Sequence, residues 1–236
     1  MLKLLLASSL TLAMASTPLQ ADPVGQSAQT TIQADTTQNQ PVEIHKALFI
    51  GDSMTGWLSE RLGAYGKQND FEVATVVWDG STIKKWGASP RLKTLIREQK
   101  PDAIFISLGM NDLFESRPET NLKTSLDKIL AAAGDVPVVW VGPPSWPGHN
   151  KGETLNSWLA DKLGEGHYFR SFDLKLPRQS KNNPHPTRQG MIQWMDALVE
   201  WVQDSGVLKF PSIDAPKSEQ MTRGKVFIYR RMKESL

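Results

Sequence analysis

Cysteine is absent from the 236-residue chain, which excludes disulfide bonds and thiolate metal sites. Stability must therefore come from a buried hydrophobic core, which a chain of this length can supply. An excess of charge of one sign is also missing: 27 Lys and Arg residues balance 25 Asp and Glu residues, and the formal net charge is +2. So small an imbalance argues against a polyanionic partner, and no nucleic acid is predicted.

Long hydrophobic runs are also lacking, since no stretch reaches the roughly 20 apolar residues that a membrane-spanning helix needs. The N-terminus instead has the pattern of a secretory signal. Lys3 precedes the apolar segment 4–15, and small residues allow cleavage after Ala15 or Ala21. We therefore predict a signal peptide over residues 1–21 and a periplasmic or secreted mature protein.

The folded domain is predicted to span residues 43–206, after a flexible tether over 22–42 that is rich in Gln, Thr and Ala. Within the domain, apolar runs alternate with helical patterns. This alternation predicts an α/β fold, a flavodoxin-like three-layer α/β/α sandwich with a central parallel sheet of about five strands. The strands are expected at about 46–50, 71–78, 102–108, 137–142 and 168–173, and a final helix at about 187–204.

A basic C-terminal extension, residues 207–236, follows the domain. Its part 217–236 contains six basic and two acidic side chains. Two interpretations of the segment Lys225–Arg231 stay open: an edge strand, or part of a loosely attached and solvated tail. Contact with a polyanion or a membrane surface is a third possibility.

Ser53, in Gly51-Asp52-Ser53, stands where an apolar strand meets an amphipathic helix. At such a junction the hydroxyl and the nearby backbone N–H groups lie at the positive end of a helix, which stabilises a developing oxyanion. The alternative is that Asp52 or Ser53 only caps the helix. The sequence of this segment alone does not decide between the two.

Three further polar segments are expected at the same edge of the sheet, because ligands of open α/β sheets bind beyond the carboxyl ends of the strands. Gly80 follows the second strand, where its backbone N–H can approach a substrate oxygen. Asn111 follows the third strand and offers a neutral carboxamide donor. His185, held between two prolines, is a candidate base for Ser53. Taken singly, each residue has an ordinary explanation as a turn or loop residue.

Trp86 and Trp146 are placed in loops after strand ends, where their rings are candidates for stacking on sugar rings. Local packing is the alternative. The remaining histidines, His45, His149 and His167, lack the spacing of metal ligands, and the chain has no HExxH motif. No metal and no cofactor are predicted.

Together, Gly51-Asp52-Ser53, Gly80, Gly109-x-Asn111-Asp112 and His185 with the following Pro-Thr resemble, in order, the blocks of the SGNH/GDSL hydrolases. The resemblance covers about residues 46–204. It implies that Ser53 is the nucleophile and His185 the general base. It also implies an oxyanion hole made by the N–H groups of Ser53 and Gly80 and the side chain of Asn111.

One position departs from the family pattern, which usually has Asp three residues before the histidine. This chain has Asn182 there. The acid of a catalytic triad fixes the tautomer of the imidazole and stabilises its charged form. The expected substitutes are a backbone carbonyl in residues 181–183, which we favour, the side-chain oxygen of Asn182, or Asp173. An inactive relative of the family is the remaining alternative.

The resemblance and the predicted export together imply a serine esterase that cleaves an acyl ester through an acyl-enzyme on Ser53. O-acetyl groups on a polysaccharide or on peptidoglycan are the expected substrate, so the expected partner is an acylated glycan. Three alternatives stay open: an O-acetyltransferase that uses the same site, a lipid or thioester hydrolase, and a non-catalytic periplasmic binding or assembly protein.

Overall fold

The computed structural model describes residues 40–149, 152–234 and 236. The predicted signal peptide and residues 22–39 of the predicted tether lie outside the described residues. The tether was predicted to extend to residue 42, but β1 (Val42–Glu43) already pairs in parallel with β7 (Leu208–Lys209). Within the described ranges, no helix is long and apolar enough to cross a membrane.

A six-stranded parallel sheet, in the order β6-β5-β4-β2-β3-β8, forms the centre of the domain. This confirms the predicted parallel sheet and adds one strand, β8. The predicted strand 168–173 is shorter than expected, because the chain turns into a 3-10 helix at Ser171–Asp173, where Ser171 Oγ accepts the Trp194 Nε1–H at 2.6 Å. The strands are β2 (Lys46–Gly51), β3 (Glu72–Trp78), β4 (Ala103–Ser107), β5 (Val138–Val141), β6 (Tyr168–Phe169) and β8 (Val226–Arg230).

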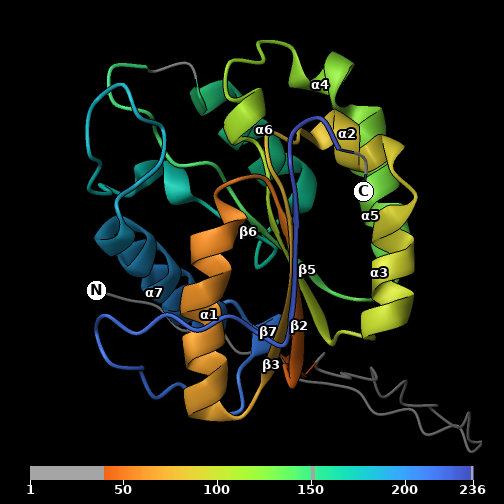
Figure 1. The fold of residues 1–236 in the computed structure, drawn as a ribbon. Coiled ribbons are helices and arrows are strands. Elements are labelled where there is room, and N and C mark those ends of the chain that lie inside the picture. Colours follow the sequence, from red (N-terminus) through yellow and green to blue (C-terminus); the bar gives the residue numbers. More distant parts are fainter. Residues whose placement is uncertain (1–39, 150–151, 235) are drawn as a thin grey trace, which may run out of the picture. The chain divides into compact units, whose positions relative to one another are not determined.

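Helices cover both faces of this sheet (Figure 1). Successive side chains of a strand point to opposite faces, so Ala47 and Phe49 of β2 pack in one core cluster and Leu48 and Ile50 in the other. The first cluster lies under α1 (Thr55–Asn69) and α7 (Arg188–Asp204). The second lies under α2 (Ile83–Ala88), α3 (Arg91–Gln99), α5 (Lys123–Ala133) and α6 (Gly152–Leu163), and the short α4 (Pro118–Asn121) precedes α5.

The C-terminal extension is an integral part of the sheet, which confirms the edge-strand interpretation and not the solvated tail. β8 pairs with β3 in parallel along its whole length. The segment before β8 is fixed by Arg61 of α1, whose side chain is only 2% exposed. Its guanidinium binds both carboxylate oxygens of Asp196 on α7, at 2.7 and 3.0 Å, and donates to the carbonyl oxygens of Lys217 and Gln220.

Candidate active site

Ser53 lies in the short turn between β2 and α1. β2 ends at Gly51, where φ is +156° and an added Cβ would lie 2.0 Å from the Ser107 carbonyl oxygen, so only glycine fits. Asp52 Oδ1 accepts the Met54 N–H at 3.0 Å and closes the turn. The N-cap of α1 is Met54, and no side chain caps it, so Ser53 does not serve as a helix cap.

His185 approaches Ser53 from the loop that precedes α7. Its Nε2 lies 2.9 Å from Ser53 Oγ, although the two residues are 132 positions apart in the sequence. The end of the loop is fixed by Thr187, whose side chain accepts the Gly190 N–H at 3.1 Å and caps α7. The fold thus brings the predicted hydroxyl and imidazole within hydrogen-bonding distance.

The other ring nitrogen of His185 faces Asn183. Asn183 Oδ1 lies 3.0 Å from the backbone nitrogen of His185 and 3.3 Å from its Nδ1. A backbone N–H only donates, so the atom that faces it is the amide oxygen. The same oxygen requires a hydrogen on Nδ1, which leaves Nε2 as the acceptor for the Ser53 hydroxyl. Asn183 therefore selects the tautomer that a general base needs.

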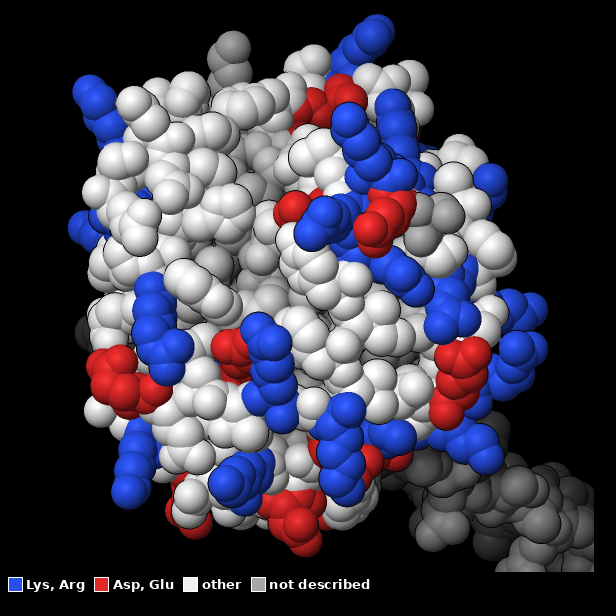
Figure 2. All heavy atoms as spheres, in the orientation of Figure 1, with Lys and Arg blue, Asp and Glu red and all other residues white. Residues whose placement is uncertain are grey.

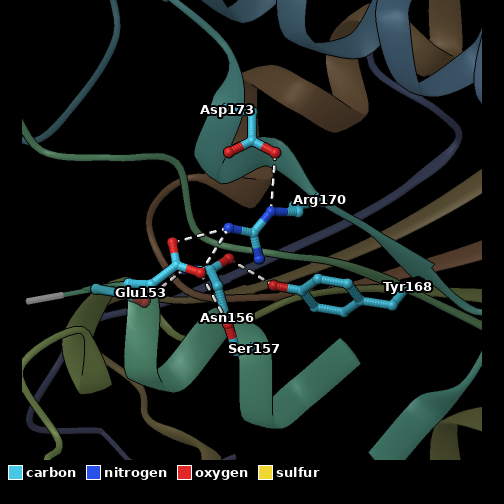
Figure 3. A network of polar contacts seen from close by, with 7 residues as sticks. Glu153, Asn156, Ser157, Tyr168, Arg170 and Asp173 are labelled. Atoms are coloured by element: carbon cyan, nitrogen blue, oxygen red, sulfur yellow. Dashed lines mark hydrogen bonds and ion pairs between the residues drawn. The ribbon is translucent and has the colours of Figure 1, made fainter. Parts of the chain in front are cut away.

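This contact corrects the expected acceptors for the imidazole. Asn182 is exposed in a turn, and the side chain that meets the ring belongs to the next residue. Asp173 is engaged elsewhere: its Oδ2 accepts from Arg170 Nε at 2.8 Å, and Arg170 also binds Glu153 of α6 (Figure 3). That network joins the end of β6 to α6. Asn183, and not Asp173, is therefore the residue that orients His185.

The surroundings of His185 favour the neutral form of its ring. Burial lowers the pKa of His185 below its ordinary value of 6.5, and the positive charge of Arg178 acts in the same direction. The negative charge of Asp79, which follows β3, opposes this shift in the pKa. A neutral imidazole is the form that accepts a proton from a serine hydroxyl.

Two of the predicted oxyanion donors, Gly80 and Asn111, follow β3 and β4. Gly80 has a φ of +61°, a left-handed conformation that favours glycine. Asn111 is exposed and lies in a 3-10 turn, where its Nδ2 donates to the Ser81 carbonyl oxygen at 2.9 Å. Its other contact, to Asp52 Oδ2, is long at 3.4 Å, so one hydrogen of the amide is weakly held.

Two carboxyl groups are buried beside these donors. Burial raises the pKa of Asp52 to about 7 and that of Asp112 to about 6, although backbone N–H groups of Met54 and Ile83 oppose the shifts. Asp52 therefore carries a proton in a large fraction of molecules at neutral pH. A protonated Asp52 places little negative charge next to the position where an oxyanion would develop.

The two tryptophans expected to contact substrate have different environments. The prediction for Trp86 is wrong: it lies on α2, only 1% exposed, and donates from Nε1 to Ser81 Oγ at 3.0 Å. Its helix is too short to show helical periodicity in the sequence, which is why a loop was expected. Trp146 is partly exposed and forms an aromatic cluster with Phe114 and His149, with ring centroids 5.0–5.9 Å apart.

A cleft of about 610 Å³ opens beside Ser53 and His185. Figure 2 shows this face hollowed, with uncharged side chains on one side of the hollow and both basic and acidic side chains on the other. Ser53 and His185 are the only cleft residues that the sequence predicted, and the residues it missed include Trp57, Arg223, Phe227 and Tyr229. The apolar run Val226–Tyr229 is a strand signal, but nothing in it indicates which strand it would join.

Asn183 was also missed, although its position carries a recognisable signal. Asn side chains commonly bind their own backbone two residues further on, and Asn183 does so with His185. Among the described residues, no group of three or more His, Cys, Asp or Glu side chains is arranged to hold a metal ion.

Residues 37–207 match the GDSL-like Lipase/Acylhydrolase family. The psychrotrophic esterase EstA from Pseudoalteromonas sp., in a structure inhibited by monoethylphosphonate, has a similar fold with a TM-score of 0.51. It is 18% identical, and the match covers 68% of this chain and 97% of EstA. TesA matches with a TM-score of 0.50 and 20% identity, over 69% of this chain and 99% of TesA. No curated protein matches the chain in sequence.

Proposed function

Because the chain belongs to the GDSL-like lipase/acylhydrolase family and is a carboxylic ester hydrolase, we propose that it is an exported serine esterase that acts through an acyl-enzyme on Ser53. His185 is the general base in this proposal, and Asn183 takes the place of the usual triad acid. The N-terminal pattern around Lys3 supports the export.

One observation carries the proposal: the chain of contacts from Ser53 Oγ to His185 Nε2, at 2.9 Å, and from His185 Nδ1 to Asn183 Oδ1, at 3.3 Å. A serine hydroxyl is a weak nucleophile unless an adjacent base takes its proton. A neutral acceptor behind the ring still fixes the tautomer, but it stabilises the imidazolium less than a carboxylate does. We therefore expect an active enzyme with a modest turnover.

In the acylation step, Ser53 Oγ attacks the ester carbonyl carbon and its proton moves to His185 Nε2. The negative charge that develops on the carbonyl oxygen is stabilised by the N–H groups of Ser53 and Gly80 and by Asn111 Nδ2, whose weakly held hydrogen turns toward it. The bond to the alcohol then breaks, and His185 returns the proton to the leaving oxygen. Water repeats the sequence with His185 as base and releases the acid.

The substrate class proposed is an O-acetylated polysaccharide or peptidoglycan. Aromatic rings near the reacting serine support a sugar substrate, since they offer flat apolar surfaces to a sugar ring. Trp57 lines the cleft and is 43% exposed. Trp146, in the aromatic cluster with Phe114 and His149, lines a separate hollow with Arg178. Trp57 is the aromatic contact that this cleft supports, and Trp146 stays a proposed contact for a more distant part of a glycan, whereas Trp86 is not one.

The test combines turnover with covalent labelling. We expect the purified protein to release p-nitrophenol from its acetate ester and to gain the mass of an organophosphonate at Ser53. Ser53→Ala should do neither, and Trp86→Phe, a change in the core, serves as the control that keeps both. A wild-type protein that neither turns over nor labels would contradict the proposed chemistry.

The substrate class needs a separate experiment. Acetate release from acetylated xylan, from acetylated peptidoglycan and from short-chain acyl esters is compared for wild type and Ser53→Ala. Higher kcat/KM on either glycan than on the simple esters is the expected result. Transfer of the acetyl group to a sugar hydroxyl, detected by mass spectrometry of the glycan products, would instead indicate an acetyltransferase with the same acyl-enzyme.

A further inference from the structure

The cleft beside Ser53 is built from two parts of the chain. Ser53, Trp57 and His185 belong to the segment that matches the family, which ends at residue 207. The opposite wall, with Phe227 and Tyr229, belongs to the C-terminal extension beyond that match. The extension therefore adds to the family site a surface that the family domain does not supply.

β8 directs alternate side chains into the cleft. It pairs in parallel with β3, so that Phe227 lies beside Thr75 and Tyr229 beside Val77. Because strand side chains alternate between the two faces, Phe227 and Tyr229 point to the side of α1, where the cleft is. Val226 and Ile228 point to the other side and pack against the core under α2 and α3.

Charged groups stand next to these rings. The Arg223 guanidinium carbon lies 4.5 Å from the centre of the Phe227 ring, and Arg223 Nε binds Glu60 Oε1 at 2.6 Å. Tyr229, which is 52% exposed, lies close to the Asp79 carboxylate. The wall thus combines flat apolar surfaces with several hydrogen-bonding groups.

This combination fits a sugar ring better than an alkyl chain. A pyranose has apolar C–H faces and a rim of hydroxyl groups, which match aromatic rings flanked by an Arg–Glu pair. A long acyl chain would cover the Arg223–Glu60 pair and remove it from water without offering hydrogen bonds, which is unfavourable. The cleft also exposes Trp57 and Tyr229, large rings that a ligand would cover.

We propose that the C-terminal extension forms a glycan-binding wall: Phe227 and Tyr229, facing Trp57, hold the sugar ring that carries the ester, and Arg223 with Glu60 binds its hydroxyl groups. The proposal rests on the proposed esterase function, which it deepens by assigning the sugar to named residues. The wall determines which esters reach Ser53, and the reaction steps at the serine are unchanged.

Hydrogen bonds join the C-terminal extension to the turn that contains Gly80. Asp79 N–H donates to the Arg230 carbonyl oxygen at 2.8 Å, and Trp78 Nε1–H donates to the Glu234 carbonyl oxygen at 2.9 Å. An added Cβ at Gly80 would lie 2.6 Å from the terminal methyl of Met232, so this methionine covers the turn. Removal of the whole extension would disturb Gly80 as well, so single substitutions are the proper test.

The test measures kcat and KM for p-nitrophenyl acetate and for two glycan probes, acetylated xylo-oligosaccharides and O-acetylated muropeptides. Tyr229→Ala and Phe227→Ala are each expected to raise KM about tenfold for at least one glycan, a larger effect than on the small ester. Tyr229→Phe keeps the ring and should keep most of the affinity. Ile213→Ala is the matched control, because Ile213 is an exposed apolar residue of the extension outside the cleft.

The outcomes separate the wall from the esterase. Unchanged KM for both glycans, or equal losses on glycan and small ester, would overturn the glycan-binding wall while leaving the esterase intact. The other case is a protein that binds glycans without turnover. A calorimetric titration of the Ser53→Ala protein with the same glycans tests it. Suppose that the wild type shows no turnover, but glycans bind and Tyr229→Ala weakens that binding. This result would support the glycan-binding wall and refute the proposed catalysis.

Discussion

Replacement of Asn183 by Asp tests the assignment of the group that orients His185. A carboxylate at the position of Asn183 Oδ1 would lie 3.3 Å from His185 Nδ1. A charge pair at that distance is worth about 5 kcal/mol at an effective dielectric constant of about 20 and about 1.3 kcal/mol in bulk water. Because both side chains are half-buried, we expect about 2–3 kcal/mol of added stabilisation for the imidazolium.

That energy has two measurable effects. If the whole of this stabilisation of the imidazolium acts in the transition state, kcat/KM for p-nitrophenyl acetate rises about 30- to 150-fold in Asn183→Asp. The same interaction raises the pKa of His185, so the acidic limb of the pH profile moves to higher pH. The gain is therefore measured on the plateau, at about pH 9, and the limb is followed down to about pH 5.

Asn182→Asp is the matched control, since it introduces the same charge one residue earlier, where the family pattern would have it. Asn182 is exposed in the turn, so kcat/KM should change by less than about threefold. Asn183→Ala removes the acceptor and should lower kcat/KM by about tenfold or more. Activation by Asn182→Asp without activation by Asn183→Asp would refute the assignment.

Three further predictions follow from burial. Because burial lowers the pKa of His185, the acidic limb of the kcat/KM profile of the wild type should lie at lower pH than an exposed histidine would give, as a pH profile would show. Asp52, with a pKa of about 7, keeps a proton that the unfolded chain releases near pH 4, so the free energy of unfolding should fall as the pH rises from about 4 to about 7. Urea titrations check this, and Asp52→Asn should flatten the slope. Trp86→Ala should cost about 3–5 kcal/mol in the same assay because the ring is fully buried. Trp146→Ala should cost less, because that ring is only partly buried.

The sheet and the meeting of the four polar segments could be predicted because their signals are local. Strands buried on both faces are nearly continuous apolar runs, as in Ala103–Ser107. All parallel strands of such a sheet end at the same edge, so Ser53, Gly80 and Asn111 had to lie near one another. The sixth strand could not be placed in this way, since β8 joins β3 without any turn that links the two.

The predictions for Asn182 and Trp86 were wrong because the direction of each side chain depends on the local path of the backbone. The spacing of the family pattern pointed to Asn182, but the loop presents the next side chain to the ring. Trp86 was placed in a loop because α2 has only six residues, too few for a helical pattern in the sequence. Its burial depends on how α2 packs against α5, and the sequence near Trp86 does not reveal that contact.

The pairing of β8 with β3 has a consequence for the folding of the chain. The paired residues Thr75 and Phe227 lie about 150 positions apart, so this contact closes a very long loop and forms slowly. Until it forms, the backbone of β3 presents unpaired N–H and C=O groups that another chain can join. Substitutions that weaken β8 should therefore reveal themselves first as aggregation during refolding, before any loss of thermal stability is seen.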